Sequence, residues 1–171
     1  ISSSITVPSQ RVAKQAKLET NSDYIKRHYK NTTKNLDTIF SQNAPSAFDE
    51  AANIIINSRH KYIVASRGNA CLGDYFLLYL KHMVRGVEST SSASISPIDH
   101  MCNISKEDCL IVFSFPRYSS MDKLAVQMAC DAGAQIILFT DKPSALLAPY
   151  ATVLITIPVD SNAFFNSLVA P

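Results

Sequence analysis

The strongest constraint on the fold is a run of four apolar residues at 110–113 that carries no polar alternation. An uninterrupted run of this length is typical of a strand that is buried on both faces of a parallel sheet. Pro116 ends the pattern, because proline lacks the N–H that a strand ladder requires. After Ser119 the apolar residues follow helical spacing, at positions 121, 124, 125, 128, 129 and 132. The segment therefore predicts a strand, a short polar loop and a helix.

Two pairs of residues have the spacing of a capping box, in which a side chain before the helix and one in its first turn bond to backbone N–H groups. Ser119 and Asp122 form one pair, and Ser46 and Asp49 form the other. Helical spacing of apolar residues predicts further helices near 22–41, from 46 to about 57, and over 72–83.

Strands and helices alternate along most of the chain. Further apolar runs occur at 62–65, 134–139 and 153–157. Such alternation builds βαβ units, whose right-handed crossovers place helices on both faces of a parallel sheet. We expect an α/β protein, a three-layer α/β/α sandwich with a roughly five-stranded parallel sheet and with N-terminal helices packed alongside. The Ser-rich stretch 88–98 leaves two alternatives open, a loop or a weak edge strand around 93–96.

Composition excludes several classes of protein. The 171 residues suit one domain, and a net charge of +2 gives little reason to expect a nucleic-acid or anionic membrane surface. Seven basic residues within 11–34 are interpreted as a solvated helix face rather than a nucleic-acid contact. No apolar run approaches the roughly 18 residues that span a bilayer, and no signal peptide is visible, so we expect a cytoplasmic protein without membrane contact.

The sequence predicts neither a metal site nor a cofactor. The four cysteines form no CxxC pair and no Cys/His ligand spacing, and Cys71, Cys109 and Cys130 are expected to be reduced thiols in the core. Neither GxGxxG nor the GxxxxGK[ST] phosphate loop occurs.

Polar residues follow three of the predicted strands, in the loops 66–70, 114–119 and 140–144. The carboxyl ends of parallel strands meet at one edge, where α/β proteins bind ligands. Two of these loops lead into helix N-termini, which favour anions, and an arginine can bind two oxygens of one phosphate. The predicted ligand-binding residues are Ser66, Arg67, Gly68, Asn69, Ser114, Arg117, Tyr118, Ser119 and Thr140.

Several of these residues also have purely structural interpretations. Ser119 is a preferred helix cap, and Gly68 is expected to be a turn residue with positive φ. Arg117 has the alternative of an ion pair at the surface or at a dimer interface, Tyr118 that of packing, and Asp141 that of an Asx-turn.

The loops offer no obvious catalytic group. Every His and every Glu of the chain lies outside them, and no G-x-S-x-G elbow is present. Proton abstraction therefore lacks a base, so we predict a binding protein with no catalytic residues.

The segments S-F-P-R-Y-S, G-A-Q-I-I-L-F-T-D-K-P and A-T-V-L-I-T-I resemble the sugar isomerase (SIS) domain. The version most similar is the effector-binding domain of RpiR-family bacterial transcriptional regulators. The resemblance covers roughly residues 45–171 and implies the flavodoxin-like strand order. SIS domains bind phosphosugars, which implies ligand contacts from Ser66, Gly68 and Asn69 in the first loop and from Ser114, Arg117 and Ser119 in the second.

Two positions depart from the family pattern. Ala70 stands where the first loop usually has a serine, and Pro116 stands where the second loop usually has another. The first change removes a hydroxyl, and the second removes a hydroxyl and an N–H, so both reduce the donors available to a phosphate.

The resemblance also implies a domain organisation and partners. In this family an N-terminal helix-turn-helix domain binds DNA, while the SIS domain senses the effector and dimerises. We expect residues 1–21 to be a tail or linker and 22–171 to be the SIS domain, with the DNA-binding domain and a C-terminal helix missing. The implied partners are a phosphorylated sugar, a second copy in a homodimer or higher homo-oligomer, and DNA only through the missing domain.

Three functions remain open at this stage. The first is a phosphosugar-sensing module of a transcriptional regulator. The second is an aldose–ketose phosphosugar isomerase whose base lies beyond Pro171. The third is a dimerisation scaffold that has lost its ligand.

Overall fold

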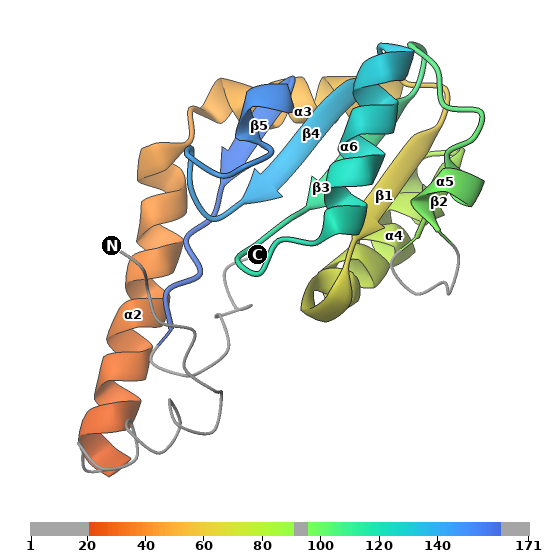
Figure 1. The fold of residues 1–171 in the computed structure, drawn as a ribbon. Helices are drawn as coiled ribbons and strands as arrows, with labels where there is room; N and C mark the ends of the chain where they lie inside the picture. Colours follow the sequence, from red (N-terminus) through yellow and green to blue (C-terminus); the bar gives the residue numbers. More distant parts are fainter. Residues whose placement is uncertain (1–20, 91–95, 162–171) are drawn as a thin grey trace.

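The computed structural model describes residues 21–90 and 96–161. One all-parallel sheet lies at its centre, with the strand order β2-β1-β3-β4-β5 (Figure 1). This is the flavodoxin-like order, so the predicted α/β fold with about five parallel strands is confirmed. The strands are β1 (Lys61–Ala65), β2 (Val87–Ser89), β3 (Cys109–Phe113), β4 (Gln135–Thr140) and β5 (Val153–Thr156).

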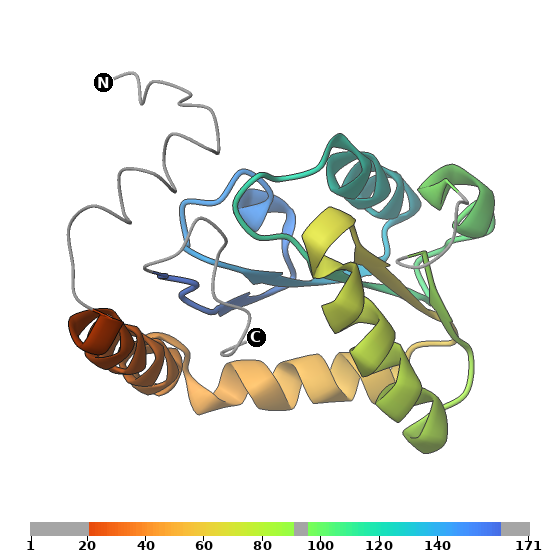
Figure 2. The same ribbon diagram turned by 90° about the horizontal axis from the view of Figure 1, so that it is seen from below.

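Helices cover both faces of this sheet (Figure 2). The helices α3 and α4 pack on one face, α6 and α5 lie on the other together with the turn η2, and α2 runs beside the β5 edge (Figure 1). The predicted three-layer sandwich is therefore present. The helical elements are α2 (Asn21–Gln42), α3 (Pro45–Asn57), η1 (Arg67–Asn69), α4 (Ala70–Met83), α5 (Pro97–His100), α6 (Ser120–Ala132) and η2 (Ala148–Tyr150).

The apolar runs in the sequence are strands buried on both faces. All five residues of β1 and all five of β3 are buried. Alternate side chains of β3 enter opposite layers of the core, with Ile111 on the side of α3 and α4 and Val112 on the side of α6. This burial explains why the runs show no polar alternation.

The second strand lies at a place that the sequence did not indicate. It spans Val87–Ser89, and the open choice between a loop and a strand around 93–96 falls largely on residues 93–95, which lie outside the described residues. This edge strand buries only Val87, which pairs with Lys61 of β1. A strand with one buried apolar residue leaves no periodic pattern in the sequence, so propensity alone did not locate it.

The start of α3 also differs. The capping box predicted from Ser46 and Asp49 is wrong, because Ala44 occupies the cap position and forms no side-chain cap bond. Pro45 is the first helical residue instead. Its fixed φ and missing N–H suit that position, where the N–H would have no partner within the helix.

Two further predictions concern the burial of the cysteines and the absence of membrane-spanning helices. All four cysteines are free thiols, with Cys109 buried and Cys130 partly buried. Cys71 is exposed, so its predicted place in the core is wrong. Within the described ranges, no helix has the length and apolar character needed to cross a membrane.

Asn43 fixes the corner between α2 and α3 against the edge of the sheet. Its Oδ1 accepts from the N–H of Thr156 at 2.7 Å, and its Nδ2 donates to the carbonyl of Thr156 at 2.8 Å. The same Nδ2 lies 2.8 Å from the carbonyl of Ile39 in α2. A single amide thus takes the place of a neighbouring strand and pairs backbone groups of β5 that would otherwise lack partners at the edge of the sheet.

We expect Asn43→Ala to lower the free energy of unfolding by about 2–3 kcal/mol, because it leaves buried backbone groups of β5 without partners. Chemical denaturation measures the change. Asn57→Ala is the matched control, since Asn57 is an exposed residue whose amide bonds only within α3. Its effect should stay within about 0.5 kcal/mol. Equal effects of the two substitutions would contradict the role given to Asn43.

Candidate functional site

The register of the sheet aligns the three polar loops. Ala65 of β1 pairs with Phe113 of β3, and Phe113 pairs with Phe139 of β4. The residues that follow, Ser66 and Ser114, therefore leave the sheet side by side at its carboxyl edge. Neighbouring hydroxyl groups at such an edge are the usual starting point of a ligand site in this fold class.

A buried carboxylate joins the first two loops. The Ser66 hydroxyl donates to Asp122 Oδ1 at 2.5 Å, and the Ser114 hydroxyl donates to Oδ2 at 3.0 Å. The backbone N–H of Ser119 also bonds to this carboxyl group. Asp122 is only 1% exposed. Both predicted serines are therefore held in place by one side chain from the first turn of α6.

The environment of Asp122 has opposing effects on its ionisation. Burial is the larger effect and raises the pKa of the carboxyl above its ordinary value. The two serine hydroxyls and the Ser119 N–H work in the opposite direction, because they stabilise the charged form. Sequence reasoning assigned Asp122 only to the start of the helix. Its contact with Ser66, 56 residues away, has no local signal in the sequence.

Ser119 is the N-cap of α6, as its sequence spacing predicts. Its Oγ accepts from the N–H of Met121 at 3.1 Å, and Asp122 reaches back to the Ser119 N–H. This reciprocal pair is the predicted capping box. Because the Ser119 oxygen accepts in the cap, the hydroxyl keeps its hydrogen as a donor for a ligand.

The second and third loops are joined through Tyr118 and Thr140. The Tyr118 hydroxyl donates to Asp141 Oδ1 at 2.5 Å. Burial, followed by this bond to a carboxylate, raises the pKa of Tyr118. Thr140 is fully buried and donates to the Ser114 carbonyl at 2.7 Å, so it lies beneath the loops and supports the backbone of the second.

Two arginines at this edge have strained backbones. Arg67 has a φ of 60° and Arg117 a φ of 75°, the left-handed region that residues with a side chain rarely adopt. Gly68 is not in that region, so its predicted positive φ is wrong and the preceding arginine carries it instead. Both arginine side chains are exposed. Such strain tends to cluster at functional loops, where the surroundings hold it in place.

The remaining residues of the first loop lie at its junction with α4. Asn69 donates through Nδ2 to the carbonyl of Phe113 at 3.4 Å, which ties this loop to the end of β3. Ala70 is the first residue of α4, and Gly68 is exposed, with no atom within 4 Å of the position that a Cβ would take. The structure thus places Ser66, Asn69 and Ser114 close together.

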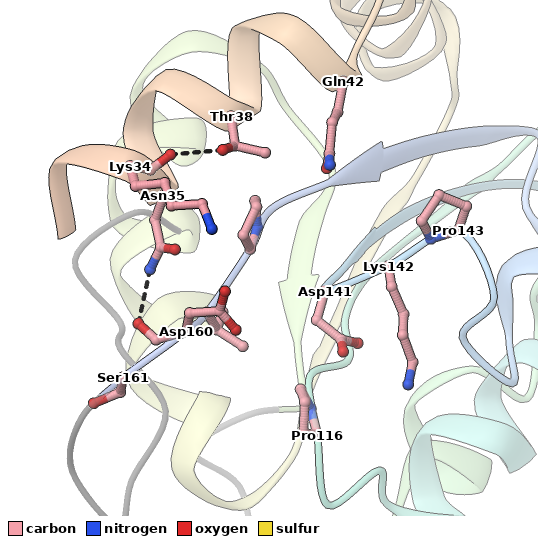
Figure 3. A pocket seen from close by; sticks show the side chains of 12 residues that line it. Lys34, Asn35, Thr38, Gln42, Pro116, Asp141, Lys142, Pro143, Asp160 and Ser161 are labelled. Carbon is pink, nitrogen blue, oxygen red and sulfur yellow. Dashed lines mark hydrogen bonds between the residues drawn. The ribbon is translucent and has the colours of Figure 1, made fainter. Parts of the chain in front are cut away.

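A cavity of about 520 Å³ adjoins the second and third loops (Figure 3). Pro116 and Asp141 of the predicted loops form one wall. The opposite wall comes from α2, through Lys34 and Asn35, and from the segment after β5, through Asp160. Asn35 is buried and donates to the Asp160 carbonyl at 2.9 Å, which joins these two parts. Sequence reasoning missed this wall, because it brings together segments more than 100 residues apart.

No group of three or more His, Cys, Asp or Glu side chains in the described ranges is arranged to hold a metal ion. Asp122 and Asp141 lie beside or within these loops, and both accept hydrogen bonds from hydroxyl groups. The arrangement is suited to binding a polar ligand through hydroxyl groups, backbone N–H groups and arginine side chains.

Comparison with protein families identifies the chain. The SIS domain model matches residues 54–171, which is more than half of the chain. The chain therefore belongs to the SIS domain family. No match was found among curated proteins.

Similar solved structures include both regulators and enzymes. The sugar isomerase domain of an RpiR transcription factor from Sphaerobacter thermophilus has a TM-score of 0.78 at 19% identity, covering 84% of this chain and 80% of the other. The Vibrio vulnificus NanR protein complexed with ManNAc-6P has a TM-score of 0.72 at 8% identity, over 93% and 59% of the two chains. Phosphoheptose isomerase GmhA from Neisseria gonorrhoeae has a TM-score of 0.71 at 14% identity, over 81% and 86%. At these identities the likeness establishes the fold alone.

The backbone strain at Arg117 gives a direct prediction. Arg117→Gly should be about 1 kcal/mol more stable than Arg117→Ala, because glycine adopts positive φ without the penalty that a Cβ brings. Denaturation of both variants measures the difference. The same two substitutions at Lys142, an exposed residue whose φ is not positive, form the control. There glycine should be no more stable than alanine, and the same order at both positions would contradict the interpretation.

Proposed function

We propose that this chain is the effector-binding domain of an RpiR-type transcriptional regulator and that it binds a phosphorylated sugar at the carboxyl edge of its sheet. The observation that carries the proposal is the joining of two loops by Asp122 beside the N-terminus of α6. Backbone N–H groups at the start of a helix, the Ser119 hydroxyl and the Arg117 guanidinium are donors of the kind that suit an anionic group.

The cavity beside the loops supports the same proposal. Its volume of about 520 Å³ lies in the range of small-molecule sites. Lys34, Lys142, Asp141 and Asp160 line it, and together they offer donors and acceptors for the hydroxyl groups of a sugar. A phosphosugar with its phosphate at the N-terminus of α6 and its sugar extending past Pro116 into the cavity would contact both the loops and the cavity.

Regulation requires that the ligand prefer one conformation of the protein. Helix α2 contributes Lys34 and Asn35 to the cavity, so a ligand there contacts the first helix of the described residues directly. In the proposed regulator, α2 lies closest in sequence to a DNA-binding domain that would precede this chain. Ligand binding would then be transmitted through the position of α2.

An isomerase is the second candidate, because similar folds occur in phosphoheptose isomerases. Isomerisation moves a proton between neighbouring carbons and requires a base that reaches the sugar. Asp122 is buried beneath the serines and Asp141 accepts from Tyr118, so neither of these two carboxylates is well placed for this task. Asp160 also lines the cavity, so the conversion experiment below decides between binding and catalysis.

Thermal unfolding with a panel of sugar phosphates, their parent sugars and inorganic phosphate tests the proposal. A ligand at about 100 times its Kd should stabilise the protein by about 2.7 kcal/mol, and the response should be lost in Arg117→Ala and Ser119→Ala. Lys81→Ala, which removes an exposed cation in the last turn of α4, should respond like the native chain.

The outcomes separate the candidate functions. Conversion of the stabilising sugar phosphate to its isomer, followed by NMR, would favour the enzyme. The absence of any response across the panel would contradict phosphosugar sensing and favour a dimerisation scaffold, which the loss of hydroxyl groups at Ala70 and Pro116 would explain.

We propose that two copies of the chain associate through α2. Ile25, Tyr29, Leu36 and Phe40 are exposed and lie on one stripe of the helix, at successive separations of four, seven and four residues. Phe40 is 81% exposed, and the buried Asn35 marks the face that packs on the domain. A continuous apolar stripe directed away from the core is typical of a helix that pairs with another copy.

We expect the chain to sediment as a dimer and the double substitution Tyr29→Ser and Phe40→Ser to shift it to a monomer, because the stripe loses its two aromatic side chains. Analytical ultracentrifugation measures the change. Leu146→Ser, an exposed apolar residue between β4 and β5, should leave the dimer intact. A monomeric native chain at tens of micromolar, or a dimer insensitive to the double substitution, would contradict this interface.

A further inference from the structure

We propose that α4 carries a second surface for pairing with another copy of the chain, and that the two α4 helices lie antiparallel in this pair. The surface consists of Tyr75, Leu78, Tyr79 and Met83, and we refer to it as the α4 face. It belongs to the layer that α3 and α4 form against the sheet, whereas the apolar stripe of α2 lies beside the β5 edge (Figure 1 and Figure 2). The inference goes beyond the proposed function and does not depend on the ligand.

The solvent side of α4 is unusually apolar. The four side chains of the α4 face are each between 52% and 71% exposed. Their successive separations of three, one and four residues place them along one side of the helix. The opposite side packs on β1 and β2 and buries Gly73 and Leu80. A helix that is apolar on both sides is normally covered on both sides, so the α4 face indicates a partner.

Two neighbouring tyrosines belong to the α4 face. The ring centroids of Tyr75 and Tyr79 lie 4.8 Å apart, so each ring restricts the position of the other. Tyrosine is among the residues that contribute most to binding at protein interfaces, because it buries a large area at little cost in conformational entropy. Met83 extends the face with a flexible side chain that adapts to the shape of a partner. The composition of the α4 face therefore suits a protein interface.

The area of the α4 face sets the strength of the pairing. An aromatic side chain buries about 150–250 Å² when it is covered, so the four exposed side chains offer roughly 400–500 Å² per copy. This is the size of the largest apolar patch on a typical monomer, roughly 300–600 Å², which is often functional. A stable interface covers about 800 Å² per partner, so contact through the α4 face alone is weak. We therefore expect this pairing at several hundred micromolar, above the concentration that the dimer through α2 requires.

The charges of α4 indicate a second copy as the partner and an antiparallel orientation. Asp74 and Lys81 are the acidic and the basic residue of this helix, apart from His82. They are seven residues apart, close to two helical turns, so they border the α4 face on the same flank. In an antiparallel pair each flank faces the same flank of the other helix, which places Asp74 opposite Lys81 of the second copy. The surface is thus complementary to itself, as a two-fold interface requires. Parallel helices would place both charges against the apolar flank instead.

Sedimentation over a range of protein concentrations tests the proposal. The native chain should change from a dimer at tens of micromolar to a tetramer at several hundred micromolar. In the Tyr29→Ser, Phe40→Ser chain, where the α2 stripe is disrupted, the same step should convert a monomer to a dimer. The double substitution Tyr75→Ser and Tyr79→Ser should remove this step in both backgrounds, with an apparent Kd at least about tenfold weaker.

Leu146→Ser combined with Tyr150→Ser is the matched control. Both side chains are exposed, and they lie at η2 on the other face of the sheet. This variant should keep the concentration-dependent step unchanged. Loss of the step in both double variants, or no such step in the native chain up to about 1 mM, would overturn the proposal.

Reversal of the charges tests the antiparallel arrangement. Lys81→Asp places acidic residues opposite each other at both ends of the pair, so the pairing should weaken by about tenfold. Addition of Asp74→Lys restores opposite charges and should recover most of the native affinity. A folded double variant that pairs no better than Lys81→Asp would overturn the proposed arrangement. Circular dichroism establishes that each variant is folded, and the tyrosine variant decides the proposal if Asp74→Lys does not fold.

Hydroxyl-radical labelling, measured by mass spectrometry, distinguishes a second copy from other occupants of the α4 face. Tyr75 and Tyr79 should react in dilute protein and become protected at several hundred micromolar. Complete protection in dilute protein would show that another part of the same chain covers the α4 face, and it would overturn the proposal. Reactivity that stays high at every concentration would also overturn it, and it would leave the α4 face to a different protein.

Discussion

The hydrogen bonds of the Asp122 carboxylate determine the geometry of the ligand edge. Through them, the loop after β1 and the loop after β3 are both fastened to the first turn of α6. Fixed in this way, the loops can hold Arg67 and Arg117 at positive φ, which costs about 1 kcal/mol for each residue. The strained arginines and the satisfied serines thus lie in the same two loops, which the buried Asp122 joins.

The fold could be predicted because its signals are local. Strands buried on both faces have uninterrupted apolar runs, and the run at 110–113 coincides with the fully buried β3. Helical spacing placed α6 within one residue of its observed start, and Ser119 caps it as its spacing indicates. Where the local signal was weak, the prediction was left open or was wrong. The edge strand β2 buries a single apolar residue, and Pro45 rather than a polar side chain begins α3.

The candidate site was predictable only in part, for a related reason. Parallel topology alone brings Ser66 and Ser114 to one edge of the sheet, so their proximity could be predicted from the sequence. Three other features depend on contacts between distant segments. They are the Asp122 carboxylate that binds both serines, the wall that α2 contributes to the cavity, and the bonds by which Asn43 anchors β5. Positive φ at Arg67 rather than at Gly68 depends on how the loop is held, which residue type does not reveal.

The internal hydrogen bonds of the edge also bear on how a sensor of this kind would work. Because Ser66, Ser114 and Tyr118 already bond to carboxylates, these side chains need no ligand to hold the loops in place. A ligand that merely fits this arrangement shifts no equilibrium, since an effector acts only through a difference in affinity between conformations. Helix α2 is the element where such a difference would matter, because it lines the cavity on one side and carries the exposed apolar stripe on another. Any effect of the ligand on assembly would therefore depend more on contacts with Lys34 and Asn35 than on contacts with the loops after β1 and β3.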